Sequence, residues 1–66
     1  MRVTINGEEQ VIEAGTTVSA LLRRLDLQPI RVAVEINKDL VTRSTFAGTV
    51  VEDGDQIEIV TFVGGG

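Results

Sequence analysis

One segment of the chain has the apolar spacing of an α-helix. Its apolar residues recur at intervals of three and four and so share one helical face: Val18, Leu21, Leu22 and Leu25. Thr16 and Thr17 precede this stripe and are suitable N-cap residues. Pro29 predicts that the helix ends near residues 25–27, because the residue before a proline disfavours helical angles. The stripe must be buried against another layer of structure.

The segments on either side of the helix alternate between apolar and polar residues, as half-buried strands do. Residues 2–5 and 9–13 predict two strands joined by Asn6-Gly7, a strong hairpin signal because both positions tolerate positive φ. Further strands are predicted at 31–37, 40–41 and 56–63, with turns at 37–39 and 52–55. Residues 44–48 predict a short helical turn or loop that contains Phe46.

This order of elements predicts an α+β fold, in which one helix packs across the apolar face of a mixed four- to five-stranded sheet. We expect the first and last strands to pair in parallel at the sheet centre, which is the β-grasp, or ubiquitin-like, arrangement. Residues 1–63 would form the domain and residues 64–66 a flexible tail. The predicted core is Val3, Ile5, Val18, Leu21, Leu22, Leu25, Val32, Val34, Ile36, Ile57 and Ile59, with Phe46 and either Val50 or Val51 at its edge.

The composition argues against several classes of function. The 66 residues include no Cys and no His, so the chain lacks thiol ligands, the commonest general base and the commonest metal ligand. The net charge of −4 and the presence of only two aromatic residues argue against nucleic-acid binding. No stretch approaches the roughly 20 apolar residues of a membrane span. We therefore expect a cytoplasmic protein that is not an enzyme.

Three consecutive glycines, Gly64, Gly65 and Gly66, follow the last predicted strand directly. Glycine has no Cβ, so this run predicts a thin, flexible tail with a carboxylate at its tip. One interpretation is a frayed terminus, because chain ends are often disordered. The other is a tail that enters a narrow active site on another protein, in which case the Gly66 carboxylate is the reactive group.

Four stretches together resemble the ThiS family, the sulfur carrier proteins of thiamine biosynthesis. They are residues 32–37 (VAVEIN), 43–46 (RSTF), 52–60 (EDGDQIEIV) and the terminal glycines, supported by Thr17-Val18 and Leu21-Leu22. The similarity spans nearly the whole chain. Family members often have Asn-Gly where this chain has Asn37-Lys38, and because Lys tolerates positive φ poorly we expect another type of turn there. Many members also have Trp where this chain has Phe46.

The resemblance implies that the chain is a co-substrate without catalytic groups of its own. An E1-like adenylyltransferase would use ATP and Mg²⁺ to adenylate Gly66. A persulfide, supplied by a donor such as a cysteine desulfurase, would then displace AMP and leave a thiocarboxylate that delivers sulfur to thiazole synthase. Gly65 would thread the partner's active site together with Gly64, which adds reach. The chain itself would bind no metal or cofactor.

Docking of the folded body is expected to involve the outward face of the last strand. Val60 and Phe62 share that face, and Val63 adjoins the tail. The alternative is that a loop of the same domain covers Val60 and Phe62. Exposed apolar residues near a functional terminus favour the docking interpretation. The charged residues nearby are interpreted mainly as solvated turn charges: Arg43, Asp53 and Asp55.

Other functions remain open from the sequence. The small subunit of molybdopterin synthase shares the fold, the Gly-Gly end and the thiocarboxylate. A ubiquitin-like modifier would instead be joined to lysines of target proteins through an isopeptide bond. A plain β-grasp interaction module would not need its tail at all.

Overall fold

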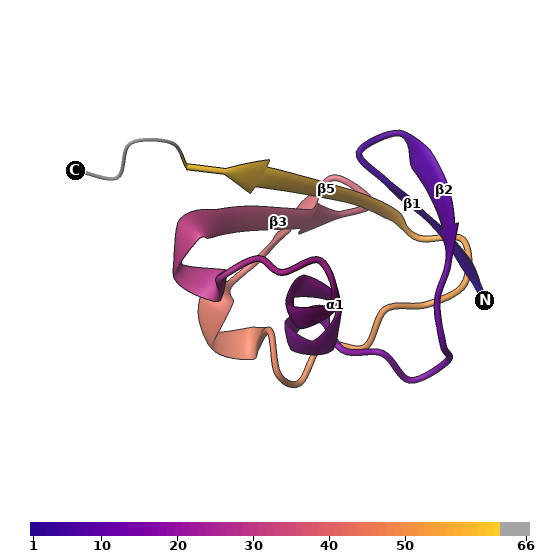
Figure 1. Ribbon diagram of the computed structural model, residues 1–66, viewed down its shortest axis with the longest axis horizontal. Helices are drawn as coiled ribbons and strands as arrows, with labels where there is room; N and C mark the ends of the chain where they lie inside the picture. Colours follow the sequence, from indigo (N-terminus) through magenta and orange to yellow (C-terminus); the bar gives the residue numbers. More distant parts are fainter. Residues whose placement is uncertain (63–66) are drawn as a thin grey trace.

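The computed structural model describes residues 1–62 and contains five strands, one α-helix and two short 3₁₀ turns (Figure 1). The strands are β1 (Arg2–Ile5), β2 (Glu8–Val11), β3 (Val32–Ile36), β4 (Asp39–Val41) and β5 (Gln56–Thr61). The helix is α1 (Val18–Arg24), and the 3₁₀ turns are η1 (Pro29–Arg31) and η2 (Arg43–Thr45).

The strands form one mixed sheet in the order β2-β1-β5-β3-β4. β1 and β5 pair in parallel, with Ile5 opposite Ile57, and the other neighbouring strands are antiparallel. The helix packs across one face of this sheet, below β3 and β5 in Figure 1. The predicted β-grasp arrangement is confirmed, including the parallel pairing that places β5 at the sheet centre.

The helix begins and ends through local hydrogen bonds that the sequence provides. Thr17 is the N-cap, and its side-chain hydroxyl accepts a bond from the Ala20 amide at 3.1 Å. At the other end, the Leu27 amide donates to the Leu22 carbonyl at 2.8 Å, and the Asp26 amide donates to the Arg23 carbonyl at 3.0 Å. This is a Schellman motif, with Asp26 in the left-handed region at φ 60°. It ends the helix at Arg24, just before the predicted range.

The core lies between α1 and the sheet, and it differs from the predicted set in four places. Ile12 is buried but was not predicted, while Leu25 and Ile36 are only partly buried at the margin of the core. Phe46 is fully buried, although it was expected at the edge. Of the two valines predicted as alternatives at the edge of the core, Val51 is buried and Val50 is exposed. The core consists of Val3, Ile5, Ile12, Val18, Leu21, Leu22, Val32, Val34, Phe46, Val51, Ile57 and Ile59.

Backbone hydrogen bonds explain the two largest differences. Strand β2 ends at Val11, and the next residue, Ile12, exchanges hydrogen bonds of 2.8 and 2.9 Å with the backbone of Met1. This pairing turns the Ile12 side chain inward, while Val11 stays exposed. Phe46 is tied to the helix, because its carbonyl accepts a 3.1 Å bond from the Ser19 amide. Its side chain belongs to the core cluster together with Val18, Leu21 and Leu22 of the helix.

Both hairpin turns have positive φ at their two central residues, as type I′ turns require. The values are 50° and 84° at Asn6 and Gly7, and 53° and 72° at Asn37 and Lys38. The expectation of another turn type at Asn37-Lys38 is therefore wrong. The twist of the β3–β4 hairpin favours this conformation, and side-chain hydrogen bonds of Asn37 hold it in place despite the lysine.

Candidate functional site

Strand β5 leads toward the terminal glycines, and two asparagine side chains fasten its backbone. The Asn6 amide group lies beyond the end of β1 and donates to the Ile59 carbonyl at 3.1 Å, while its oxygen accepts from the Ile59 amide at 2.8 Å. On the other side, the Asn37 side-chain oxygen accepts from the Gln56 amide at 3.0 Å. Each asparagine side chain therefore makes hydrogen bonds to the β5 backbone of the kind that a further residue of the neighbouring strand would make. The two turns thereby hold β5 in place as well as reversing the chain.

The ladder continues past the end of β5. The Phe62 amide donates to the Arg31 carbonyl at 2.8 Å, so the chain is hydrogen-bonded to its neighbour as far as the last residue that the structure describes. Val63, Gly64, Gly65 and Gly66 lie outside the described residues, and their predicted roles stay predictions. The folded body thus holds the backbone in place as far as Phe62.

The sheet face opposite α1, which we call the open face, contains the predicted docking residues. Val60 is 59% exposed and Phe62 is 49% exposed. No described loop covers either side chain, so the alternative that the domain itself buries them does not hold. Their docking role stays a prediction, since no partner chain is present.

Leu40 belongs to the same surface and was not predicted as a docking residue. It is 66% exposed and lies opposite Glu35, whose side chain alternates with the buried Val34. Ala33 pairs with Val60 and completes the apolar group, which we call the apolar patch: Ala33, Leu40, Val60 and Phe62. The sequence contained enough information to predict the position of Leu40, because the two-residue turn at Asn37-Lys38 fixes the register of β4 against β3.

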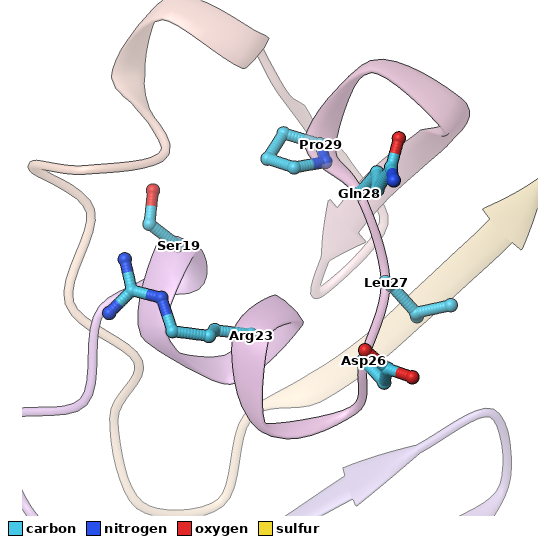
Figure 2. A pocket seen from close by; sticks show the side chains of 6 residues that line it. All are labelled: Ser19, Arg23, Asp26, Leu27, Gln28 and Pro29. Carbon is cyan, nitrogen blue, oxygen red and sulfur yellow. The ribbon is translucent and has the colours of Figure 1, made fainter.

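A hollow at the C-terminal end of α1 does not bring together a nucleophile and a base (Figure 2). Ser19 and Arg23 lie on one side of it, and Asp26 points away from both. Ser19 therefore has no base to activate its hydroxyl. Among residues 1–62 no cluster of three or more carboxylate, imidazole or thiol groups could hold a metal ion. In the same range, no helix is long and apolar enough to cross a bilayer.

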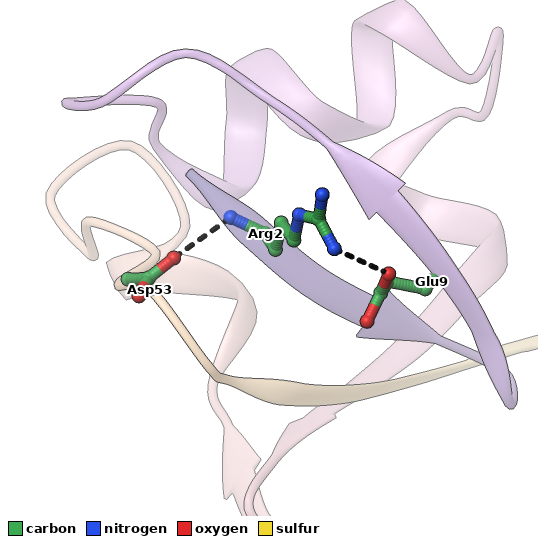
Figure 3. Close-up of polar contacts among 3 residues, drawn as sticks. All are labelled: Arg2, Glu9 and Asp53. Carbon is green, nitrogen blue, oxygen red and sulfur yellow. Dashed lines mark hydrogen bonds and ion pairs between the residues drawn. The ribbon is translucent and has the colours of Figure 1, made fainter.

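The charged turn residues that were weaker docking candidates have structural partners. Arg43 donates from Nε to the Pro29 carbonyl at 3.0 Å and so braces η1. The Asp53 carboxylate accepts from the Arg2 amide at 2.8 Å (Figure 3), and the Asp55 carboxylate accepts from the Glu52 amide at 2.8 Å. These contacts support the interpretation that these charges stabilise turns.

Within residues 1–62, one α-helix lies across a five-stranded mixed sheet with a parallel central pair, which defines a small ubiquitin-like protein of the β-grasp class. Comparison with known proteins gives the family. The model of the ThiS family matches residues 2–66. The chain therefore belongs to the ThiS family.

Individual relatives agree with this assignment. The Escherichia coli sulfur carrier protein ThiS is 36% identical over the full length of both chains. The crystal structure of a thiamine biosynthesis protein (ThiS) from Geobacter metallireducens superposes with a TM-score of 0.85 at 36% identity, and the match covers both chains completely. A thiazole synthase from Magnetococcus marinus is 48% identical over 66 residues, which are all of this chain but only 20% of that protein. The chain therefore spans about a fifth of the length of that relative.

Proposed function

We propose that the chain is a protein co-substrate whose Gly66 carboxylate is converted to a thiocarboxylate for synthesis of the thiamine thiazole ring. Membership of the ThiS family is the observation that supports this most directly. The fold agrees with it, because the central strand is fastened to its neighbours up to Phe62 and leads toward the glycines. In this proposal the reacting group is at the C-terminus, and the chain needs no catalytic side chains.

The chemistry requires activation by another protein. A carboxylate is ionised at neutral pH and is a poor electrophile. An E1-like adenylyltransferase would therefore join the Gly66 carboxylate to AMP from Mg²⁺-bound ATP, with release of pyrophosphate. The terminal sulfur of a persulfide, supplied by a donor such as a cysteine desulfurase, would attack the acyl carbon and expel AMP. A thiol would then attack the donor's sulfur in the resulting acyl disulfide, so that a disulfide forms between the thiol and the donor, the original S–S bond breaks and the thiocarboxylate is released.

The glycine run suits entry into such an active site. Gly64 to Gly66 would span roughly 10 Å when extended, at about 3.3–3.6 Å per residue. Ordering each residue costs on the order of 1–2 kcal/mol, so the tail alone would bind weakly. Contacts made by the folded body would offset that cost. The apolar patch, together with Val63, is the proposed docking surface, since Val60 lies on β5 and Phe62 directly follows that strand, which leads toward the tail.

This docking role is testable by substitution. Val60→Ser and Phe62→Ser should each lower kcat/KM for adenylation by the activating enzyme about tenfold or more, because each removes an apolar contact at a desolvated interface. Val11→Ser is the matched control, since Val11 is also an exposed strand valine, 64% exposed on β2. The measurement is pyrophosphate release at varied carrier concentration. Equal kcat/KM for all three variants and the parent would contradict the docking role.

Thiazole synthase is the proposed acceptor of the sulfur. The support comes from the Magnetococcus marinus relative, a thiazole synthase whose chain includes a segment 48% identical to this one. In that relative, a segment similar to this chain and a thiazole synthase belong to one polypeptide. We propose that this chain likewise acts together with thiazole synthase.

Intact-mass spectrometry tests the proposed function. The chain is incubated with the activating enzyme, ATP, Mg²⁺ and a persulfide source. The expected product has one oxygen replaced by one sulfur at its own C-terminus. Branched Gly-Gly remnants on lysines of other proteins would instead indicate a ubiquitin-like modifier. Sulfur transfer to the large subunit of molybdopterin synthase, and not to thiazole synthase, would assign the chain to the other carrier pathway.

A further inference from the structure

Two glutamates lie directly opposite each other on the open face, beside the apolar patch. Glu35 of β3 pairs with Glu58 of β5, and both side chains are exposed. Residues paired in this way have Cβ atoms about 4.5–5.5 Å apart. Leu40 is the other neighbour of Glu35, and Val60 follows Glu58 by two residues on the same face. The acidic pair, Glu35 and Glu58, therefore adjoins the apolar patch.

Within residues 1–62 the acidic pair has no cationic partner. The only ion pair in that range is Arg2–Glu9, at 3.2 Å, on the β1–β2 side of the sheet (Figure 3). Lys38, in the turn after β3, lines the same hollow as Glu58, and Arg31 directly precedes β3, but neither forms an ion pair with Glu35 or Glu58. On the same sheet, the charge of Glu9 is therefore paired with that of Arg2 on the neighbouring strand, whereas Glu35 and Glu58 form no ion pair within the described residues.

Like charges directly opposite each other in a sheet destabilise it. The fold thus contains an unfavourable pair at an exposed position where many polar residues would be accepted. A cation placed between the two carboxylates would relieve the repulsion, and the chain's net charge of −4 would attract a basic surface from a distance. The apolar patch beside the pair would meanwhile be covered by the same partner.

We infer that thiazole synthase docks on the open face with apolar side chains against Leu40 and Val60 and with a lysine or arginine side chain between Glu35 and Glu58. This inference rests on the proposed function, which makes thiazole synthase the sulfur acceptor. It adds the chemistry of the partner's surface, which is apolar with a basic group at its border. Charged groups at the rim of an interface mainly accelerate association.

The test measures association of the full-length carrier with thiazole synthase by stopped flow or surface plasmon resonance, in low and high NaCl. Glu35→Gln and Glu58→Gln should each slow association about three- to tenfold at low salt, and the difference from the parent should shrink at high salt as charges are screened. Glu9→Gln is the matched control, because it makes the same charge change on the same sheet. It should leave the association rate within about twofold of the parent.

Thermal unfolding of the same variants separates docking from folding. Glu35→Gln and Glu58→Gln should keep or raise Tm, by about 1–6 °C, because each removes the repulsion. Slower association in a variant that is at least as stable as the parent would support the inference. Association rates equal to the parent's in both variants, or an equal slowing by Glu9→Gln, would overturn it. Intact-mass detection of the thiocarboxylate tests the proposed function separately, so either idea can fail alone.

Discussion

Deletion of Gly66 is expected to lower the rate of thiocarboxylate formation at least about 100-fold while leaving the fold intact. The shortened chain still ends in two glycines, but its carboxylate falls short by one residue, about 3.3–3.6 Å. A displacement of about 1 Å from the reactive geometry can already cost roughly 100-fold. Every core residue lies between Val3 and Ile59, so folding should not change. Intact mass against time measures the rate, and circular dichroism checks the fold.

A substitution that keeps the length of the tail is the control for this deletion. Gly64→Ala adds one methyl group at the glycine farthest from the reacting end. If Gly64 serves mainly as a spacer, this variant should retain most of the charging rate. A deletion variant charged as fast as the parent would mean that the position of the terminal carboxylate does not matter, and the carrier proposal would fail.

Replacement of Leu22 by Ala is expected to give the largest loss of stability. Leu22 has no exposed surface, and it lies at the centre of the contact between α1 and the sheet. A buried Leu→Ala change costs about 2–5 kcal/mol. A domain of this size has a free energy of unfolding of roughly 3–10 kcal/mol. We expect Tm to fall by at least about 10 °C, as followed by circular dichroism.

Leu40→Ala is the matched control for stability. The side chain is also leucine but is 66% exposed on the open face. Its replacement should change the free energy of unfolding by less than about 0.5 kcal/mol. Equal destabilisation by the two substitutions would contradict the position of the core between α1 and the sheet.

The sequence predicts those parts of the fold that depend on local patterns. Thr17 caps the helix as expected, and the parallel pairing of the first and last strands follows from the order of elements. The predictions that were wrong concern residues whose conformation depends on contacts with other parts of the chain. Ile12 is buried because Met1 pairs with it, and Lys38 adopts positive φ because hairpin twist and the side-chain bonds of Asn37 outweigh its own preference.

The candidate site was predictable to the same extent. Alternation along the last strand places Val60 and Phe62 on the outward face, and the structure shows both side chains exposed. Leu40 lies on β4 and Glu35 on β3, and their proximity to Val60 and Glu58 of β5 depends on the register between the three strands. Periodicity within one strand gives the face of a residue but not its neighbour across the ladder.

The fastening of β5 also determines how the protein responds to mechanical load. A partner that grips the tail pulls on β5 along its length. Because β5 is central, with β1 parallel on one side and β3 antiparallel on the other, such a pull shears both ladders at once. The side-chain bonds of Asn6 and Asn37 are loaded together with them. If a partner holds the tail as proposed, force on the folded body would load both ladders and both asparagine side chains before β5 could detach.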